Sequence, residues 1–339
     1  MKIQFLSRRG HFQLLCKELK SYSINCEIID NKKSRNALAL PSQYYINKID
    51  SDLLVTHNPY YGLYGGKKAK KAGKIDSLIF RLKADHWTEE KSLNISYKHK
   101  LGYILKRYQY NESINDVDFI ISISDYMKKI ALKHGLNKKI YLMYNGVDIK
   151  RFHGREFEPN YKSELLCVMN FNIPEKIVLL EEFFKQYYEM NLNYKITILG
   201  NGEFINKVKS TVKRLGLSDK VIFKGYVNDI EHYYSNCDIV IHPSSLESFG
   251  MVFLEAGASA KPCVATNVGA TSEILVNNKT GYVTDTVYEF VDKVDSLMSD
   301  PEKRLMIGKN AEERVYEFFR WGRIAQTFIN ILKEECLLD

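Results

Sequence analysis

The sequence predicts an α/β protein with two doubly wound parallel sheets, one in each of two domains that face a cleft. Three observations support this prediction. Short apolar runs with the length of buried strands alternate with helical patterns along most of the 339 residues. One polar stretch, residues 153–163, interrupts the alternation. A chain of this length also exceeds one ordinary core and suits two domains of roughly 150 residues each.

The first domain is predicted over residues 1–152. Strands are expected where Val, Ile, Leu and Phe cluster between polar turns, because parallel strands are buried on both faces. The apolar runs of this half lie at residues 2–6, 26–29, 52–56, 77–82, 118–124 and 139–144.

The second domain is predicted over residues 164–319, after the linker at 153–163. Its apolar runs lie at residues 165–170, 194–200, 220–225, 238–243, 262–267 and 281–285. From Pro301 onward only helical patterns follow. The last helix, over residues 320–339, is expected to return to the first domain.

Composition excludes several classes of protein. The apolar fraction of 45% and the charged fraction of 27% are typical of folded soluble proteins, and no low-complexity tract interrupts them. The start of the chain lacks a signal-peptide core, and no stretch approaches the ~20 apolar residues of a membrane span. We therefore expect a cytoplasmic protein. The six cysteines are scattered without a metal-binding pattern and are expected to be buried free thiols.

Charge is distributed unevenly along the chain. Residues 1–160 contain 29 Lys and Arg against 16 Asp and Glu, whereas residues 161–339 contain 20 against 25. A basic first domain indicates an anionic partner, either a nucleic acid or an acidic membrane surface. The sequence offers no reading helix and no base-stacking sheet, so a membrane surface is the preferred partner and no nucleic acid is expected.

A basic amphipathic helix is predicted over residues 95–110. One face is apolar and aromatic, and Lys98, Lys106 and Arg107 surround it. Helices of this kind bind anionic membranes, and the lysine-rich segment 67–74 adds five cations. The alternative is that both segments are solvated helices packed on the sheet.

Two carboxylates, Glu247 and Glu255, flank an apolar run in the second domain. A strand is expected to end at residue 243 and a helix to begin near Gly250, which places Glu247 in a loop and Glu255 in the helix. Ligands of doubly wound sheets collect where strands end and helices begin. Since a carboxylate accepts hydrogen bonds from vicinal hydroxyls, the two acids are expected to bind opposite ends of a nucleotide sugar. The alternative is that Glu247 caps the helix and Glu255 is exposed.

The run HPSSLESFGMVFLEAGASAKPCVATNVGATSEILVNNKTGYV, residues 242–283, resembles the nucleotide-sugar domain of retaining glycosyltransferases of family 4. The segments DFIISISDYMKKIALKHG and YNGVDIKRF, and ITILGNGEF with VIFKGYVNDI, extend the resemblance over much of the chain. It implies the GT-B fold of two Rossmann-like domains, a nucleotide-diphosphate sugar as donor, and no metal or other cofactor.

The resemblance also implies a role for each matching position. Glu247 would hold the hydroxyls of the transferred sugar and Glu255 the ribose. Gly10 would let the first domain approach the diphosphate. The remaining donor contacts would come from backbone groups, of Tyr226 and Val227 to the nucleobase and of Phe249, Gly250, Met251 and Val252 to the sugar and diphosphate.

The chain departs from the family pattern at the leaving group. Most members place an Arg and, six residues later, a Lys after the first strand of the second domain. Here the Lys is Lys176, but the Arg position is occupied by Asn170, and both residues are expected to contact the donor. One of the two expected cations that stabilise the departing diphosphate is therefore missing. Lys224, Arg8 and Arg9 are candidate replacements.

A second departure concerns the His that many members have after the fourth strand. The aligned position is Lys83 or Asp85, and His86 is the fallback. Asp85 is expected to orient the acceptor hydroxyl or take its proton, with Glu247 and Lys176 as the other catalytic residues. The alternative is that Asp85 is a helix N-cap.

The predicted reaction is transfer of the sugar to an acceptor hydroxyl with retention of the anomeric configuration. Asp116 and Asp118 mimic a metal-binding Asp-x-Asp but lead into a strand, and are expected to be structural. The acceptor is expected to be lipid-linked or a glycan at the inner face of the membrane, in glycan, glycolipid or cell-surface polysaccharide synthesis. The rival functions are a nucleotide-sugar-binding protein without transferase activity and an epimerase of the same fold.

Overall fold

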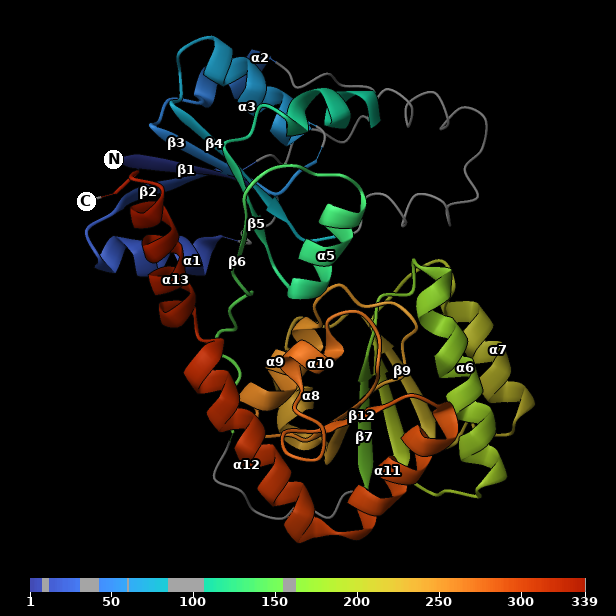
Figure 1. The fold of residues 1–339 in the computed structure, drawn as a ribbon. Coiled ribbons are helices and arrows are strands. Elements are labelled where there is room, and N and C mark those ends of the chain that lie inside the picture. Colours follow the sequence, from blue (N-terminus) through green and yellow to red (C-terminus); the bar gives the residue numbers. More distant parts are fainter. Residues whose placement is uncertain (8–11, 31–42, 60, 85–106, 155–162, 339) are drawn as a thin grey trace. The chain divides into compact units, whose positions relative to one another are not determined.

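The computed structural model describes residues 1–7, 12–30, 43–59, 61–84, 107–154 and 163–338. The chain forms two compact units (Figure 1). The first unit comprises Met1–Asn145 and Trp321–Asp339, and the second comprises Gly146–Arg320. Each contains a six-stranded sheet in which all neighbouring strands are parallel. The predicted fold class of two doubly wound α/β sheets is therefore confirmed.

The sheet of the first unit has the strand order β2-β1-β3-β4-β5-β6. Each apolar run expected in this half contains a strand. The strands are β1 (Lys2–Ser7), β2 (Asn25–Asp30), β3 (Leu53–Thr56), β4 (Ser77–Leu82), β5 (Phe119–Ser122) and β6 (Ile140–Leu142). The helices between them include α1 (Gln13–Ser21), α2 (Gln43–Lys48), α3 (Tyr61–Lys71) and α5 (Asp125–Lys133).

The last helix, α13 (Trp321–Glu334), is part of the first unit. Its buried face contains Ile324 and Phe328, which pack in one cluster with Phe12 and Leu15 beside α1. Burying an apolar side chain of this size contributes roughly 1.5–3 kcal/mol. The amphipathic pattern of this helix therefore explains why the end of the chain lies against the first sheet.

The sheet of the second unit has the strand order β12-β11-β10-β7-β8-β9. Its strands are β7 (Glu164–Val168), β8 (Lys195–Leu199), β9 (Val221–Gly225), β10 (Ile239–His242), β11 (Cys263–Thr266) and β12 (Tyr282–Thr284). Its helices are α6 (Pro174–Glu189), α7 (Ile205–Arg214), α8 (Ile230–Asn236), α9 (Met251–Ala258), α10 (Thr271–Ile274), α11 (Val287–Ser299) and α12 (Pro301–Phe318). This is the dinucleotide-fold order, and its direction reverses between β7 and β10.

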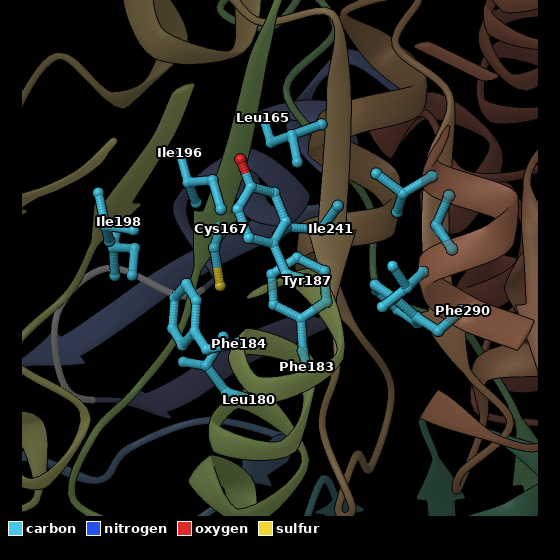
Figure 2. Packing of buried hydrophobic residues seen from close by; sticks show 14 of the residues in the cluster. Leu165, Cys167, Leu180, Phe183, Phe184, Tyr187, Ile196, Ile198, Ile241 and Phe290 are labelled. Carbon is cyan, nitrogen blue, oxygen red and sulfur yellow. The ribbon is translucent and has the colours of Figure 1, made fainter. Parts of the chain in front are cut away.

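Aromatic side chains of α6 fill one face of this second sheet (Figure 2). Phe183, Phe184 and Tyr187 are fully buried, and the ring of Phe183 lies 5.6 Å from that of Phe290 on α11. The hydroxyl of Tyr187 donates to the carbonyl of Tyr194 at 2.8 Å, so its one polar atom is satisfied inside the core. Pro174 at the first turn sets the start of this helix.

The boundary between the units falls earlier than the predicted residue 152. The backbone N–H of Val147 donates to the carbonyl of Phe319 at 2.9 Å, and both residues belong to the second unit. The ring of Phe152 packs edge-on against Tyr234 of α8, with 5.6 Å between the ring centres. The segment after Asn145 is therefore attached to the second unit by hydrogen bonding and packing. Most of the linker predicted at 153–163 lies outside the described residues.

Several smaller expectations can be compared with the structure. Five of the six free cysteines are buried as expected, but Cys336 is exposed, because it follows the last helix at the surface. Asp118 pairs with Lys70 at 2.5 Å and accepts a hydrogen bond from the backbone N–H of Leu78 at 2.7 Å, which is a structural role. Within the described residues, no helix combines the length and apolar character that crossing a membrane requires.

Candidate functional site

The candidate site lies at the carboxyl ends of β7 and β10, where the strand order of the second sheet reverses. Ligands of doubly wound sheets bind at this point. The connection from β7 to α6 carries Asn170, and Lys176 lies in the first turn of α6. The connection from β10 to α9 carries Glu247, and Glu255 lies within α9. The topology thus brings together predicted donor-binding residues from segments about 80 positions apart.

Two glycines shape the loop that carries Glu247. Gly250 is the N-cap of α9 and has a φ of 90°, a left-handed conformation that glycine adopts without strain. A Cβ there would also collide with the ring of Phe253. Gly269 has a φ of 57°, and a Cβ on it would collide with the backbone of Glu247. The loop can therefore lie close to the turn after β11 because Gly269 lacks a side chain, and α9 can begin tightly against Phe253 because Gly250 does.

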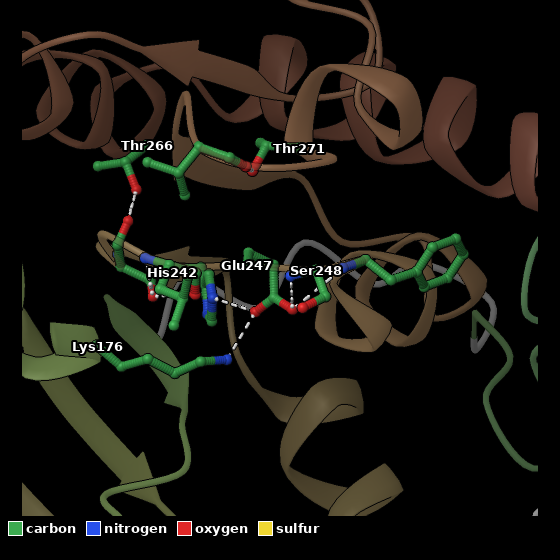
Figure 3. A network of polar contacts seen from close by, with 10 residues as sticks. Lys176, His242, Glu247, Ser248, Thr266 and Thr271 are labelled. Atoms are coloured by element: carbon green, nitrogen blue, oxygen red, sulfur yellow. Dashed lines mark hydrogen bonds and ion pairs between the residues drawn. The ribbon is translucent and has the colours of Figure 1, made fainter. Parts of the chain in front are cut away.

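Both carboxylate oxygens of Glu247 are hydrogen-bonded (Figure 3). Oε2 lies 3.2 Å from Lys176 Nζ and 3.2 Å from His242 Nε2. Oε1 accepts from the backbone N–H groups of Ser248 at 3.1 Å and Phe249 at 3.4 Å. A carboxylate has about four acceptor positions, so the protein itself engages all of them.

These contacts keep Glu247 ionised. Its side chain is 13% exposed, and burial alone would raise the carboxyl pKa. The hydrogen bond and charge of His242, followed by those of Lys176, outweigh burial and lower the pKa of Glu247 to about 2. Glu247 is therefore a fixed negative charge at neutral pH.

Glu255 has a different environment. Its Oε2 accepts a hydrogen bond from the hydroxyl of Tyr234 at 2.7 Å. Burial raises the pKa of Glu255 to about 7, although the Tyr234 hydrogen bond and the charge of Arg151 act in the opposite direction. Burial also raises the pKa of Tyr234, which is fully buried in α8, so the phenol remains a donor. The two acids of the motif are thus held in opposite electrostatic settings.

Asn170 forms a tight turn after β7. Its Oδ1 accepts from the backbone N–H of Asn172 at 3.0 Å and from the amide nitrogen of the same residue at 2.9 Å. A Cβ on Gly202 would collide with the backbone of Phe171 and Asn172, so this turn is packed closely against its neighbour. The position where an Arg was expected therefore has a local structural use, and its donor-binding role stays a prediction.

Other predicted contacts lie at the end of β9. Tyr226 follows Gly225, which has a φ of 70°, and its side chain is 77% exposed. Val227 is half-buried beside it. Lys224, a candidate replacement for the missing cation, is exposed on the strand itself. Met251 and Val252 are in the first turn of α9, which contains no acidic residue, and backbone N–H groups in a first turn lack partners within the helix.

Several predicted residues lie outside the described parts of the chain. These are Arg8, Arg9, Gly10, Asp85, His86, Lys98 and Lys106. Arg107 is exposed on a helical segment. In the basic segment 67–74, Lys67 pairs with Asp116 at 3.0 Å and Lys70 with Asp118 at 2.5 Å. Acidic neighbours therefore compensate part of the positive charge counted in this segment.

The sequence analysis missed two residues of the site, His242 and Tyr234. His242 ends β10, is 2% exposed, and packs edge-on against Phe253 with 5.3 Å between the rings. The available signal was a polar side chain at the carboxyl end of an otherwise apolar strand. Tyr234 gave no comparable signal, because its contact with Glu255 depends on how α8 packs beside α9.

Comparison with known proteins agrees with this geometry. Residues 148–314 match the family model "Glycosyl transferases group 1", and residues 27–151 match "Glycosyltransferase Family 4". N-acetyl-alpha-D-glucosaminyl L-malate synthase of Bacillus anthracis is 30% identical over 207 residues, which are 58% of this chain and 54% of that protein. The capsular polysaccharide biosynthesis glycosyltransferase CapM of Staphylococcus aureus is 27% identical over 63% of this chain and 62% of its own length.

The fold also matches solved structures. Anabaena Alr3699/HepE, crystallised with UDP and glucose, superposes with a TM-score of 0.78 at 18% identity, over 98% of this chain and 100% of the other. The matched region is less than two thirds of the length of either curated relative above. The two family models together span residues 27–314, and the fold is GT-B. The chain belongs to the group 1 glycosyltransferases of family 4.

Proposed function

We propose that the protein is a retaining glycosyltransferase that moves a sugar from a nucleotide diphosphate to an acceptor hydroxyl. The observation that carries this proposal is the ionised Glu247, held between Lys176 and the amides that precede α9, at the switch point of a dinucleotide-type sheet. A fixed carboxylate can accept hydrogen bonds from sugar hydroxyls, and the cation and helix N–H groups beside it can bind phosphates. This arrangement fits a ligand in which a sugar is attached to a diphosphate.

Lys176 has to change partner during this reaction. All acceptor positions of Glu247 are engaged, so sugar hydroxyls can bind it only if one contact is released. Lys176 is the long and flexible partner among the four, and the departing diphosphate is the stronger anion. Transfer of the ammonium group from Glu247 to the diphosphate would free a carboxylate position and stabilise the leaving group in one movement.

The remaining roles follow from the positions of the other groups. Glu255 would bind the ribose hydroxyls, and the first-turn amides of α9 would bind the diphosphate. The base would lie beside Tyr226, and Asp85 would orient the acceptor hydroxyl. The attacking oxygen would approach the face that the diphosphate leaves, and the scheme needs no metal ion.

For the acceptor, we propose a lipid-linked molecule or a glycan at the inner surface of the membrane. The positive charge of residues 1–160 supports this class of acceptor, as does the likeness to a protein of capsular polysaccharide biosynthesis. In this proposal the protein is cytoplasmic and associates peripherally with the bilayer.

A two-stage experiment tests the function. Thermal unfolding is first measured with UDP-, GDP- and ADP-sugars, because a ligand that binds only the folded state raises the melting temperature. The stabilising donor is then incubated with membrane extract, and the anomeric configuration of the product is determined by NMR. Stabilisation without transfer and without slow donor hydrolysis would favour a binding protein, and inversion at the anomeric carbon would exclude the retaining mechanism.

A further inference from the structure

Arg81 is a buried cation in the first unit with no acidic partner among the described residues. It lies on β4, is 5% exposed, and has its guanidinium 5.5 Å from the centre of the Phe12 ring. One terminal nitrogen donates to Asn145 Oδ1 at 2.9 Å and to the carbonyl of Tyr144 at 3.3 Å, whereas the buried Nε has no hydrogen-bond partner in the described parts of the chain. Buried charges are normally paired, because removing them from water is costly.

Lys83 adds a second cation at the same edge of the sheet. It follows the end of β4 by one residue, is half-buried, and makes no ion pair with any described residue. Burial, followed by the positive charge of Arg81, lowers the pKa of Lys83 to about 8. The two side chains are thus close enough for one to act on the charge of the other, and neither is compensated by an acid in the described structure.

This cationic pair lies where ligands of a parallel sheet bind. Leu82, between the two cations, pairs with Ser122 at the end of β5, and Thr56 ends β3 on the other side. The two cations therefore lie at the edge of the sheet where three neighbouring strands end, on the face opposite to the side chains of Leu82, Ser122 and Thr56. A purely structural role accounts for the hydrogen bonds of Arg81 to Asn145 and Tyr144, but it leaves the unpartnered Nε and the second cation unexplained.

We propose that Arg81 and Lys83 form an anion-binding subsite for a phosphate or carboxylate group carried by the acceptor. A planar guanidinium donates hydrogen bonds to either anion in a fixed geometry, and a nearby ammonium adds a point charge. The subsite rests on the proposed transferase function, and it narrows the acceptor to molecules that carry an anionic group near the reacting hydroxyl.

Small hydroxyl-bearing anions test this subsite. Thermal unfolding of the full chain is measured with glycerol 3-phosphate, L-malate and uncharged glycerol, for the wild type and for Lys83→Met, Lys83→Arg and Lys17→Met. Lys17 is an exposed lysine on α1, so its variant matches the charge loss at a different place in the same unit. We expect at least one anion, but not glycerol, to stabilise the wild type and Lys17→Met. Lys83→Met should weaken the apparent affinity about tenfold, the weight of one charged hydrogen bond.

The pH dependence separates a charged subsite from a packing effect. Lys83 is charged below about pH 8 and neutral above it, so wild-type affinity for the anion should fall between pH 7 and pH 9. An arginine at this position keeps its charge, so Lys83→Arg should retain binding and lose most of this pH dependence. A response to glycerol 3-phosphate alone would identify a phosphate subsite, and a response to L-malate alone a carboxylate subsite.

Three results would overturn the proposal. These are stabilisation by neither anion, equal stabilisation by glycerol and the anions, and full anion binding in Lys83→Met. UDP-glucose, UDP-N-acetylglucosamine and GDP-mannose are measured on the same proteins, because their binding depends on Glu247 and Glu255 in the other unit. If these donors stabilise the wild type and the anions do not, only the subsite fails. If the anions bind and none of these donors does, the acceptor role fails together with the proposed transferase function.

Discussion

Glu247 and Glu255 lie on one loop and the helix that follows it, yet their surroundings shift their acidity in opposite directions. Glu247 contacts Lys176 and His242, which lower its pKa to about 2, whereas burial raises the pKa of Glu255 to about 7 even though the hydroxyl of Tyr234 donates to it. Both side chains are largely buried, so burial alone does not decide the result. The difference depends on whether the partner is charged.

This contrast separates two tasks within one ligand site. A carboxylate that stays ionised and oriented suits the end of the ligand where charge changes during bond breaking. A carboxylate whose partner is a neutral phenol suits the end where hydroxyls are only held. In the proposed function the motif contains one acid for the reacting sugar and one for the nucleotide, and replacing each acid separately tests this division.

The largest effect is expected for Glu247→Gln. The amide keeps the shape of the side chain but removes the negative charge between Lys176 and His242, so turnover should fall by about 10²–10³, the loss seen when one electrostatic contact to a transition state is removed. Binding of the free nucleoside diphosphate should change little. Steady-state kinetics and calorimetric titration measure the two quantities, and a larger loss of nucleotide affinity than of turnover would contradict the division of roles.

The stability of the protein should depend on Glu255 in the neutral pH range. An acid whose pKa is about 7 in the folded state, against 4.5 when unfolded, destabilises the fold as pH rises from 4.5 to 7, because the unfolded chain releases its proton first. The loss amounts to roughly 3 kcal/mol above pH 7. Urea unfolding at pH 5 and pH 8 should show that Glu255→Gln removes this loss. An unchanged pH profile in the variant would show that Glu255 ionises normally.

The low pKa of Glu247 predicts the opposite pH dependence of folding stability. Its pKa is about 2 in the folded state, so it contributes stability that is complete above pH 4.5 and is lost as pH falls toward 2. Between pH 3 and pH 5, the free energy of unfolding should change less with pH in Glu247→Gln than in the wild type. Equal slopes in this range would mean that Lys176 and His242 do not hold the carboxylate in solution.

A smaller effect is expected for Tyr234→Phe. The substitution keeps the ring that packs against Phe152 and removes the hydroxyl that donates to Glu255. Stability and nucleotide affinity should each decrease by about 1 kcal/mol, the net weight of one hydrogen bond. Tyr187→Phe, at a buried tyrosine whose hydroxyl bonds to Tyr194, is the matched control and should lower stability without changing nucleotide affinity. If Tyr234→Phe and Tyr187→Phe bound the nucleotide with the same affinity, Tyr234 would have no role in nucleotide binding.

The sequence alone was sufficient for the architecture and for the placement of the two acids, with Glu247 in a loop and Glu255 in the helix that follows it. Alternating apolar runs located the strands because parallel strands are buried on both faces, and a pattern of this kind is local in the chain. Gly250 marked the start of α9 for a similar reason, since a left-handed N-cap favours glycine. The sequence did not locate the start of the second unit at Gly146, because the hydrogen bond from Val147 to Phe319 joins positions far apart in the sequence.

Tertiary structure decided the properties that make these residues a site. The pKa of Glu247 depends on a lysine from α6 and a histidine from β10, and that of Glu255 on a tyrosine from α8. The uncompensated charges of Arg81 and Lys83 likewise became visible only when their neighbours were known. Residue type and spacing determine which elements form, because those preferences are local. Electrostatic energy depends on distance and burial, and both are set by the packing of segments that the sequence keeps apart.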